Sequence, residues 1–231
     1  MTSIEPVSCS FPRAMTPNSE PAYDPLSPLL QVGFGQRTFD AEGLETPGRF
    51  FSRALHWPGG ASGVTIGRGY DMGGRSSEQV QRELLLAGLE AGEAALLSRA
   101  AGLKGGDARS FVAEWKPCAP VLSLQAQQSL FTNVTLPETL QDVRRILEKP
   151  DVVARYGAVA WNTLPAAAQE LLFDLRYRGD YTPGTRERIQ PLLVAKDWAG
   201  LREAMEDRPF WQSRGVPANR ITARTEIVSE L

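Results

Sequence analysis

The chain has 231 residues, of which 42% are hydrophobic and 23% are charged. This composition allows one large domain or two small ones with a sizeable core, and it excludes a largely disordered protein. The 25 Lys+Arg residues nearly balance the 27 Asp+Glu residues, so charge does not predict nucleic-acid binding. No apolar run reaches about 18 residues, so we expect no transmembrane segment. The first residues lack the basic and apolar regions of a secretory signal peptide.

The beginning of the chain differs in composition from the rest. Residues 1–30 contain six prolines and show no sustained hydrophobic period. This pattern is typical of an extended arm or linker, so we expect an arm over 1–30 and one folded domain over 31–231.

The cysteines and the single histidine exclude several kinds of site. Cys9 and Cys118 are far apart and follow no metal-ligand spacing, so two free thiols are favoured over a disulfide, which stays open. His56 is the one histidine, which excludes a multi-histidine zinc site. We expect no metal and no other cofactor.

The predicted elements are one strand followed by helices. In residues 63–70, three β-branched side chains and one aromatic side chain lie between glycines, which predicts a strand. From residue 76 onward, apolar side chains recur at helical spacing between capping residues and breakers. We expect six to eight helices, with segments beginning near Ser76, Asp107, Ser123, Pro137, Pro165, Asp197 and Pro217. The prediction is an α+β fold dominated by helix.

The densest group of unusual residues lies between positions 42 and 71. Thr65 and Asp71 are six apart, so a regular strand would place both side chains on one face. Glu42 or Glu45 is then available to face them. Glycoside hydrolysis requires two carboxyl groups, one protonated and one ionised, and a threonine hydroxyl can hold the attacking water.

The string SGVTIGRGYDMG at residues 62–73 resembles the signature of the pesticin-like and phage-type lysozymes. In that superfamily a Glu, a Thr and an Asp form the catalytic set, and the order here is similar to the pesticin arrangement. Glu42 is followed by glycine, as the acid of the family is, which favours it over Glu45. The resemblance implies a lysozyme-like fold with a small β-containing lobe and a helical lobe.

The resemblance also implies roles for individual residues. Glu42 would be the general acid, Asp71 the base that activates water, and Thr65 the residue that positions the water, with inversion at the anomeric carbon. The Pro217-Ala218-Asn219-Arg220 sequence resembles a family turn whose arginine, here Arg220, reaches the catalytic glutamate.

Other residues along the chain are candidates for binding substrate. His56 is one such candidate, with a structural role as the alternative. Trp57, Tyr70 and Trp211 are candidates for stacking on sugars, with a core role equally open. Arg68 and Arg214 are candidates for binding peptide-stem carboxylates, with an exposed surface role as the alternative.

The expected function is that of a muramidase, which cuts the β-1,4 bond between N-acetylmuramic acid and N-acetylglucosamine in peptidoglycan. A chitin- or chitosan-type glycosidase, a lytic transglycosylase and a non-catalytic cell-wall-binding domain are the alternatives. We expect a monomer that is made in the bacterial cytoplasm and acts in the periplasm or on the cell wall of a target cell. Delivery by a secretion system, as a bacteriocin or by phage lysis stays open, and an immunity protein or a secretion-machinery component is a possible partner.

Overall fold

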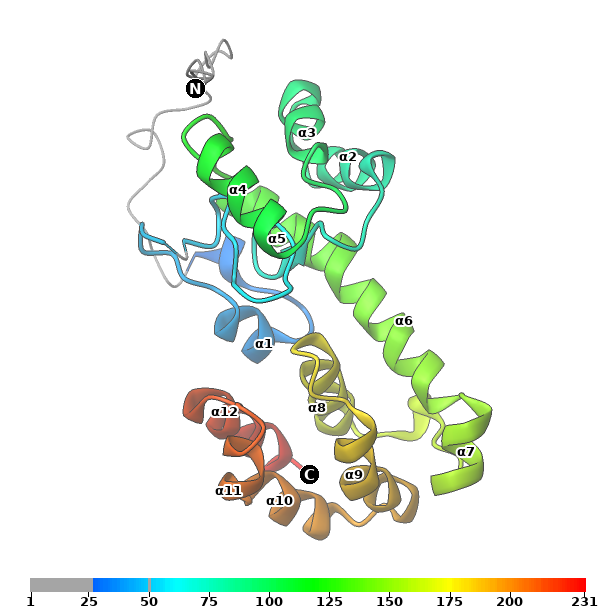
Figure 1. The fold of residues 1–231 in the computed structure, drawn as a ribbon. Coiled ribbons are helices and arrows are strands. Elements are labelled where there is room, and N and C mark those ends of the chain that lie inside the picture. Colours follow the sequence, from blue (N-terminus) through cyan, green and yellow to red (C-terminus); the bar gives the residue numbers. More distant parts are fainter. Residues whose placement is uncertain (1–26, 50) are drawn as a thin grey trace. The chain divides into compact units, whose positions relative to one another are not determined.

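A computed structural model describes residues 27–49 and 51–231. The fold is α+β and mostly helical, as predicted: the described residues form twelve α-helices and one two-stranded antiparallel sheet (Figure 1). No helix in these two ranges combines the length and the apolar character that crossing a membrane requires.

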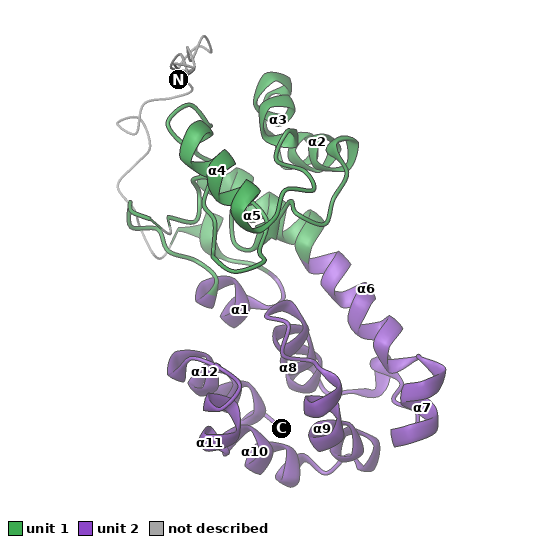
Figure 2. Cartoon of the chain, in the orientation of Figure 1, with its two compact units in different colours: residues 1–32, 42–135 green, residues 33–41, 136–231 purple. Residues whose placement is uncertain are grey.

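The described chain divides into two compact units (Figure 2). Unit 1 takes residues 27–32 and 42–135, and unit 2 takes Gly33–Ala41 and Leu136–Leu231. Each unit has a hydrophobic core of its own. The core of unit 1 is built around Val64, Ile66, Tyr70 and Met72, so the signature segment is part of that core.

Unit 1 contains the sheet and four α-helices among its described residues. Its elements are η1 (Pro28–Leu30), β1 (Thr65–Ile66), β2 (Tyr70–Asp71), α2 (Ser77–Leu86), α3 (Ala91–Ser98), α4 (Gly105–Trp115), α5 (Leu124–Leu130) and the π-helix η2 (Phe131–Thr135). The predicted caps are confirmed at Ser76, whose Oγ accepts from Gln79 N–H, and at Ser123, whose Oγ accepts from Ala126 N–H. The apolar face that begins after Ser76 belongs to two helices, because the chain turns at Gly88 with a φ of 95°.

Unit 2 is entirely helical in its described residues. Its elements are α1 (Gln36–Ala41), α6 (Leu136–Leu147), α7 (Pro150–Tyr156), η3 (Trp161–Thr163), α8 (Ala166–Tyr177), α9 (Pro183–Ala195), α10 (Trp198–Glu206), α11 (Arg208–Gln212) and α12 (Ala218–Val228). The helices predicted from Pro137, Pro165, Asp197 and Pro217 are α6, α8, α10 and α12. The helices α1, α7, α9 and α11 were not predicted from the sequence.

The two ends of the predicted arm differ in what the structure describes. Residues 1–26 lie outside the described residues, whereas 27–30 pack on unit 1: Leu30 is buried and the Gln128 side chain donates to the Pro28 carbonyl at 3.2 Å.

Cys118 is disulfide-bonded, which corrects the preference for a free thiol at this position. Cys9, the second cysteine of the sequence, lies outside the described residues.

Candidate functional site

The signature segment forms a hairpin, not the single strand predicted over 63–70. β1 and β2 pair antiparallel and are joined by Gly67, Arg68 and Gly69. Gly67 and Gly69 have φ angles of 63° and 82°, in the left-handed region that glycine adopts at little cost. The two glycines therefore reverse the chain where a continuous strand was expected.

The hairpin places Thr65 and Asp71 directly opposite each other. The backbone N–H and C=O of Thr65 both point away from Asp71 and bond to His56. Thr65 N–H donates to the His56 carbonyl at 2.9 Å, and His56 N–H donates to the Thr65 carbonyl at 3.0 Å. Thr65 and Asp71 therefore form a non-hydrogen-bonded pair, in which the side chains share a face and approach most closely. The prediction that they share a face is confirmed, although by a different local structure.

Two backbone amides hold the carboxyl group of Asp71. Gly73 N–H donates to Oδ1 at 2.6 Å, and Gly63 N–H donates to Oδ2 at 3.0 Å. A methyl group on Gly63 would lie less than 3.0 Å from Asp71 Oδ1 and Gly73 N, so glycine is required there. An ionised carboxylate accepts about four hydrogen bonds, so each oxygen keeps acceptor capacity for a water or a sugar hydroxyl.

Glu42 and Glu45 occupy different surroundings in the same loop. Glu42 is half-buried. It follows Ala41, the last residue of α1, and is the residue at which the sequence returns from unit 2 to unit 1. Glu45 is buried, and its oxygens accept from Arg53 Nε at 3.0 Å, Arg68 Nη2 at 2.9 Å and Gln127 Nε2 at 2.7 Å. These contacts give Glu45 a structural role, and Glu42 as the acid stays a prediction.

His56 lies in the same row of the sheet as Thr65 and Asp71, since it is the bridge partner of Thr65. Its Nδ1 lies 3.0 Å from the Ala54 carbonyl oxygen, which fixes Nδ1 as the protonated nitrogen of the neutral ring. Burial lowers the pKa of His56, and the charge of Lys116 lowers it further, against an opposing effect of the Ala54 carbonyl. The ring is therefore neutral at pH 7.

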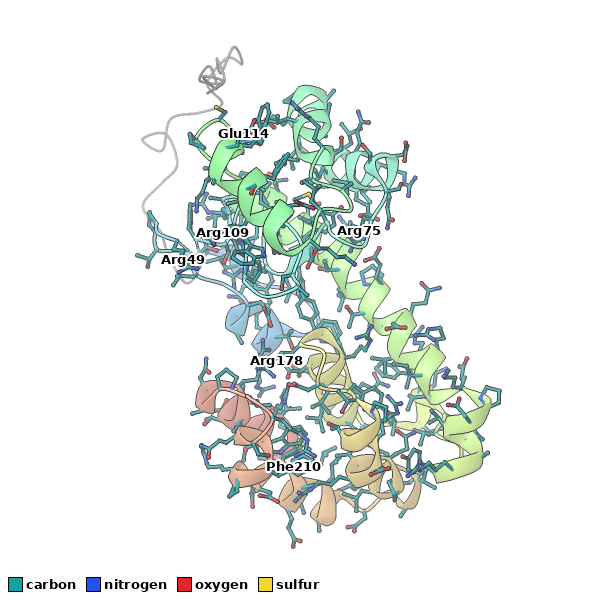
Figure 3. All side chains as sticks on the ribbon, in the orientation of Figure 1. Arg49, Arg75, Arg109, Glu114, Arg178 and Phe210 are labelled. Atoms are coloured by element: carbon teal, nitrogen blue, oxygen red, sulfur yellow. The ribbon has the colours of Figure 1, made fainter. Side chains whose placement is uncertain are left out.

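Two further candidates are structural residues of unit 1. Tyr70 is 0% exposed, and its hydroxyl donates to Glu83 Oε2 at 2.6 Å, so it cannot stack on a sugar. Arg75, labelled in Figure 3, also binds Glu83 and lies over the Tyr70 ring. Arg68 is 5% exposed and is paired with Glu45, which corrects its prediction as a ligand of peptide-stem carboxylates.

Trp57 stays a candidate for sugar binding. It is partly buried, packs on the core of unit 1, and donates its indole N–H to the Ser62 carbonyl at 3.2 Å. This bond fixes the ring next to the loop that enters β1.

Within the described residues, no group of three or more His, Cys, Asp or Glu side chains is arranged to hold a metal ion.

The C-terminal candidates belong to unit 2. Arg220 and Arg224 both donate to the buried Asp174, and Thr38 Oγ1 also donates to that carboxylate at 2.9 Å. Trp211 is buried in the core of unit 2 and donates to the Ala204 carbonyl, so it is not a sugar platform. A contact between Arg220 and Glu42 stays a prediction.

Unit 2 also holds Arg214, the other candidate for binding peptide stems. It is exposed and lies over the ring of Phe210, which Figure 3 labels. Its exposure fits the surface role weighed from the sequence, and binding of peptide stems by this side chain stays a prediction.

Comparison with known proteins gives a family but no function. No curated protein matches the chain. A family model described as a domain of unknown function (DUF8812) matches residues 35–225, a range that includes Glu42, Thr65, Asp71 and Arg220. The chain therefore belongs to the DUF8812 family.

Proposed function

We propose that the protein is a peptidoglycan muramidase. The observation that carries the proposal is the direct pairing of Thr65 and Asp71 in a hairpin whose turn residue, Arg68, binds the segment after Glu42. The three residue types that inverting glycoside hydrolysis uses thus belong to two adjoining segments of one unit.

Each of the three residues has a separate task in this proposal. Glu42 is half-buried, and it gives its proton to the leaving glycosidic oxygen. Asp71 accepts hydrogen bonds from the Gly63 and Gly73 amides, and its carboxylate takes a proton from the attacking water. Thr65 Oγ1 makes one long bond, 3.4 Å to the Gly63 carbonyl, and its acceptor sites are available to orient that water.

The reaction products distinguish this function from the alternatives. A muramidase acting on purified peptidoglycan releases new reducing ends on N-acetylmuramic acid, and mass spectrometry shows one added water per cut. A lytic transglycosylase releases 1,6-anhydro products with no added water, and a chitinase-type enzyme cleaves chitin in preference to peptidoglycan. Binding to peptidoglycan with no cleavage would indicate a cell-wall-binding domain and overturn the proposal.

We further propose that the protein acts as an antibacterial effector or lysis enzyme that reaches peptidoglycan from outside the cytoplasm. The substrate is absent from the cytoplasm, so expression there should be tolerated. The same chain fused to a periplasmic export signal should lyse the host, whereas its Glu42→Gln variant should not. A producer that exposes its own wall to this enzyme needs an immunity protein that blocks the site.

A further inference from the structure

Arg68 connects the hairpin turn to the segment that follows Glu42. Its Nη2 donates to Glu45 Oε1 at 2.9 Å, and both side chains are at most 4% exposed. Glu45 is held in turn by Arg53 and Gln127, which come from a later loop and from α5. The far end of the Arg68 side chain is therefore fixed by a buried carboxylate that other elements also hold.

The same guanidinium group also lies against Gly43, the residue next to Glu42. A methyl group on Gly43 would lie less than 3.0 Å from Cζ, Nη1 and Nε of Arg68. The φ of Gly43 is outside the left-handed region, so the close approach of Arg68, and not the backbone conformation, explains the glycine here. Gly43, the residue that follows Glu42, thus leaves the space that the Arg68 side chain fills.

We propose that Arg68 is a positioning residue that sets the place of the Glu42 carboxyl group relative to Thr65 and Asp71. The inference rests on the proposed muramidase function, in which Glu42 is the acid. Arg68 leaves the hairpin three residues after Thr65 and three before Asp71. It contacts segment 43–45 at both ends, through Gly43 and Glu45. One side chain therefore couples the segment carrying the acid to the hairpin carrying the other two groups.

Arginine suits this task better than lysine. Its planar guanidinium can lie flat on a glycine while one edge donates to a carboxylate, whereas an ammonium is a point charge on a flexible stem. Arg68→Lys therefore keeps the positive charge beside Glu45 and loses the flat contact with Gly43. Proton transfer is sensitive to such changes, because a displacement of about 1 Å costs about 100-fold in rate.

The test uses Gly43→Ala in the full chain, with Gly48→Ala as the matched control. Gly48 lies in the same loop, also has φ outside the left-handed region, and has open space where a methyl group would go. Rates are measured on soluble, uncross-linked peptidoglycan strands, and the folded fraction is measured by circular dichroism. We expect Gly43→Ala to lower kcat about 10- to 100-fold with KM within twofold. Gly48→Ala should stay within twofold of wild type in both.

A double-mutant cycle tests whether Arg68 mediates the effect. In the Arg68→Ala background there is room for the methyl group, so adding Gly43→Ala should change kcat less than twofold. Arg68→Ser serves the same purpose should Arg68→Ala fold poorly, because serine also ends short of the atoms that approach Gly43. The pH profile should keep both limbs in Gly43→Ala while its plateau falls, because the acid is displaced and not removed.

The outcomes separate this inference from the proposed function. Wild-type kcat in Gly43→Ala, or independent multiplicative effects of the two substitutions, would overturn the positioning role while leaving the muramidase in place. A wild-type protein that releases no reducing ends would overturn the proposed function, and with it the role of Arg68 at an acid. Thermal melts of the same four proteins report the coupling between Gly43 and Arg68 whether or not the chain is active.

Discussion

Thr65 and Asp71 are direct cross-strand partners in a non-hydrogen-bonded pair, with His56 on the other side of Thr65. In such a pair the two side chains lie on one face at the closest spacing that a sheet allows. A hydroxyl and a carboxylate are thereby held next to each other by the backbone ladder, with Asp71 also fixed by the amides of Gly63 and Gly73. The tightly turned, glycine-rich hairpin orients these two groups before any substrate binds.

The first prediction concerns the acid. Glu42→Gln should lower the rate of reducing-end release about 10²- to 10⁴-fold, the usual contribution of general acid–base catalysis. Its melting temperature should stay within a few degrees of wild type, because the substitution keeps the side-chain volume. Glu114→Gln, on the exposed face of α4 and labelled in Figure 3, is the control and should be fully active. An active Glu42→Gln enzyme would exclude Glu42 as the acid.

The second prediction concerns pH and His56. Because burial lowers its pKa below the ordinary 6.5, the unfolded chain binds this proton more readily than the folded chain. The corresponding stability is present above about pH 6.5 and is lost as pH falls toward the pKa of the folded state. Thermal melts between pH 7 and pH 5 should therefore show a smaller loss of stability in His56→Gln than in wild type. Equal slopes would contradict a neutral, buried His56.

The activity profile of the same variant tests a separate point. A working acid–base pair gives a bell-shaped dependence on pH, and His56→Gln should keep both limbs if the two carboxyl groups carry the chemistry. Loss of one limb would mean that the imidazole, which lies in the same row as Thr65 and Asp71, titrates in the reaction.

Local signals in the sequence predicted much of the helical structure. The caps at Ser76, Ser123 and Asp197 involve partners three residues away, so a short window of sequence contains the whole interaction. The helix α9 was missed because Pro191 interrupts its pattern, although Thr182 caps its start. The hairpin was not predicted because the β-branched residues 64–66 are typical of a strand, and a glycine at 67 or 69 does not by itself indicate a positive φ.

Long-range contacts explain why the site was only partly predicted. Thr65 and Asp71 were placed on one face because their separation is even, and a hairpin with this register gives the same result. The burial of Arg68 depends on Glu45, which is 23 residues away, and Gln127 is 82 residues from that carboxylate. Nothing in a single sequence indicates such pairs, so both roles weighed for Arg68, a ligand of peptide stems and a surface residue, placed it in solvent.

The third prediction concerns the N-terminal arm. Deletion of residues 1–26 should leave peptidoglycan cleavage intact, because the family match begins at residue 35. Deletion through residue 30 should also remove the burial of Leu30 in unit 1 and cost about 1.5–3 kcal/mol of stability. Urea melts and rates of reducing-end release measure the two effects. Since both truncations remove Cys9, the full chains with Cys9→Ser and with Cys118→Ser are the controls for loss of a cysteine. If deletion of residues 1–26 abolishes cleavage while the cysteine controls stay active, the arm is part of the catalytic unit.

The last prediction concerns stereochemistry. If Asp71 activates a water on the face opposite the leaving group, the new N-acetylmuramic acid ends should appear first as the α-anomer, and NMR during the first turnovers distinguishes this from the β-anomer. Thr65→Glu would put a carboxylate where the water is held, and it should trap a glycosyl-enzyme or switch the product to the β-anomer. Asp71→Asn is a weaker test, because its amide NH₂ would face one of the two backbone donors from Gly63 and Gly73 and so also disturb the hairpin. A wild-type enzyme that releases the β-anomer first would make Asp71 a nucleophile and remove the water-holding role of Thr65.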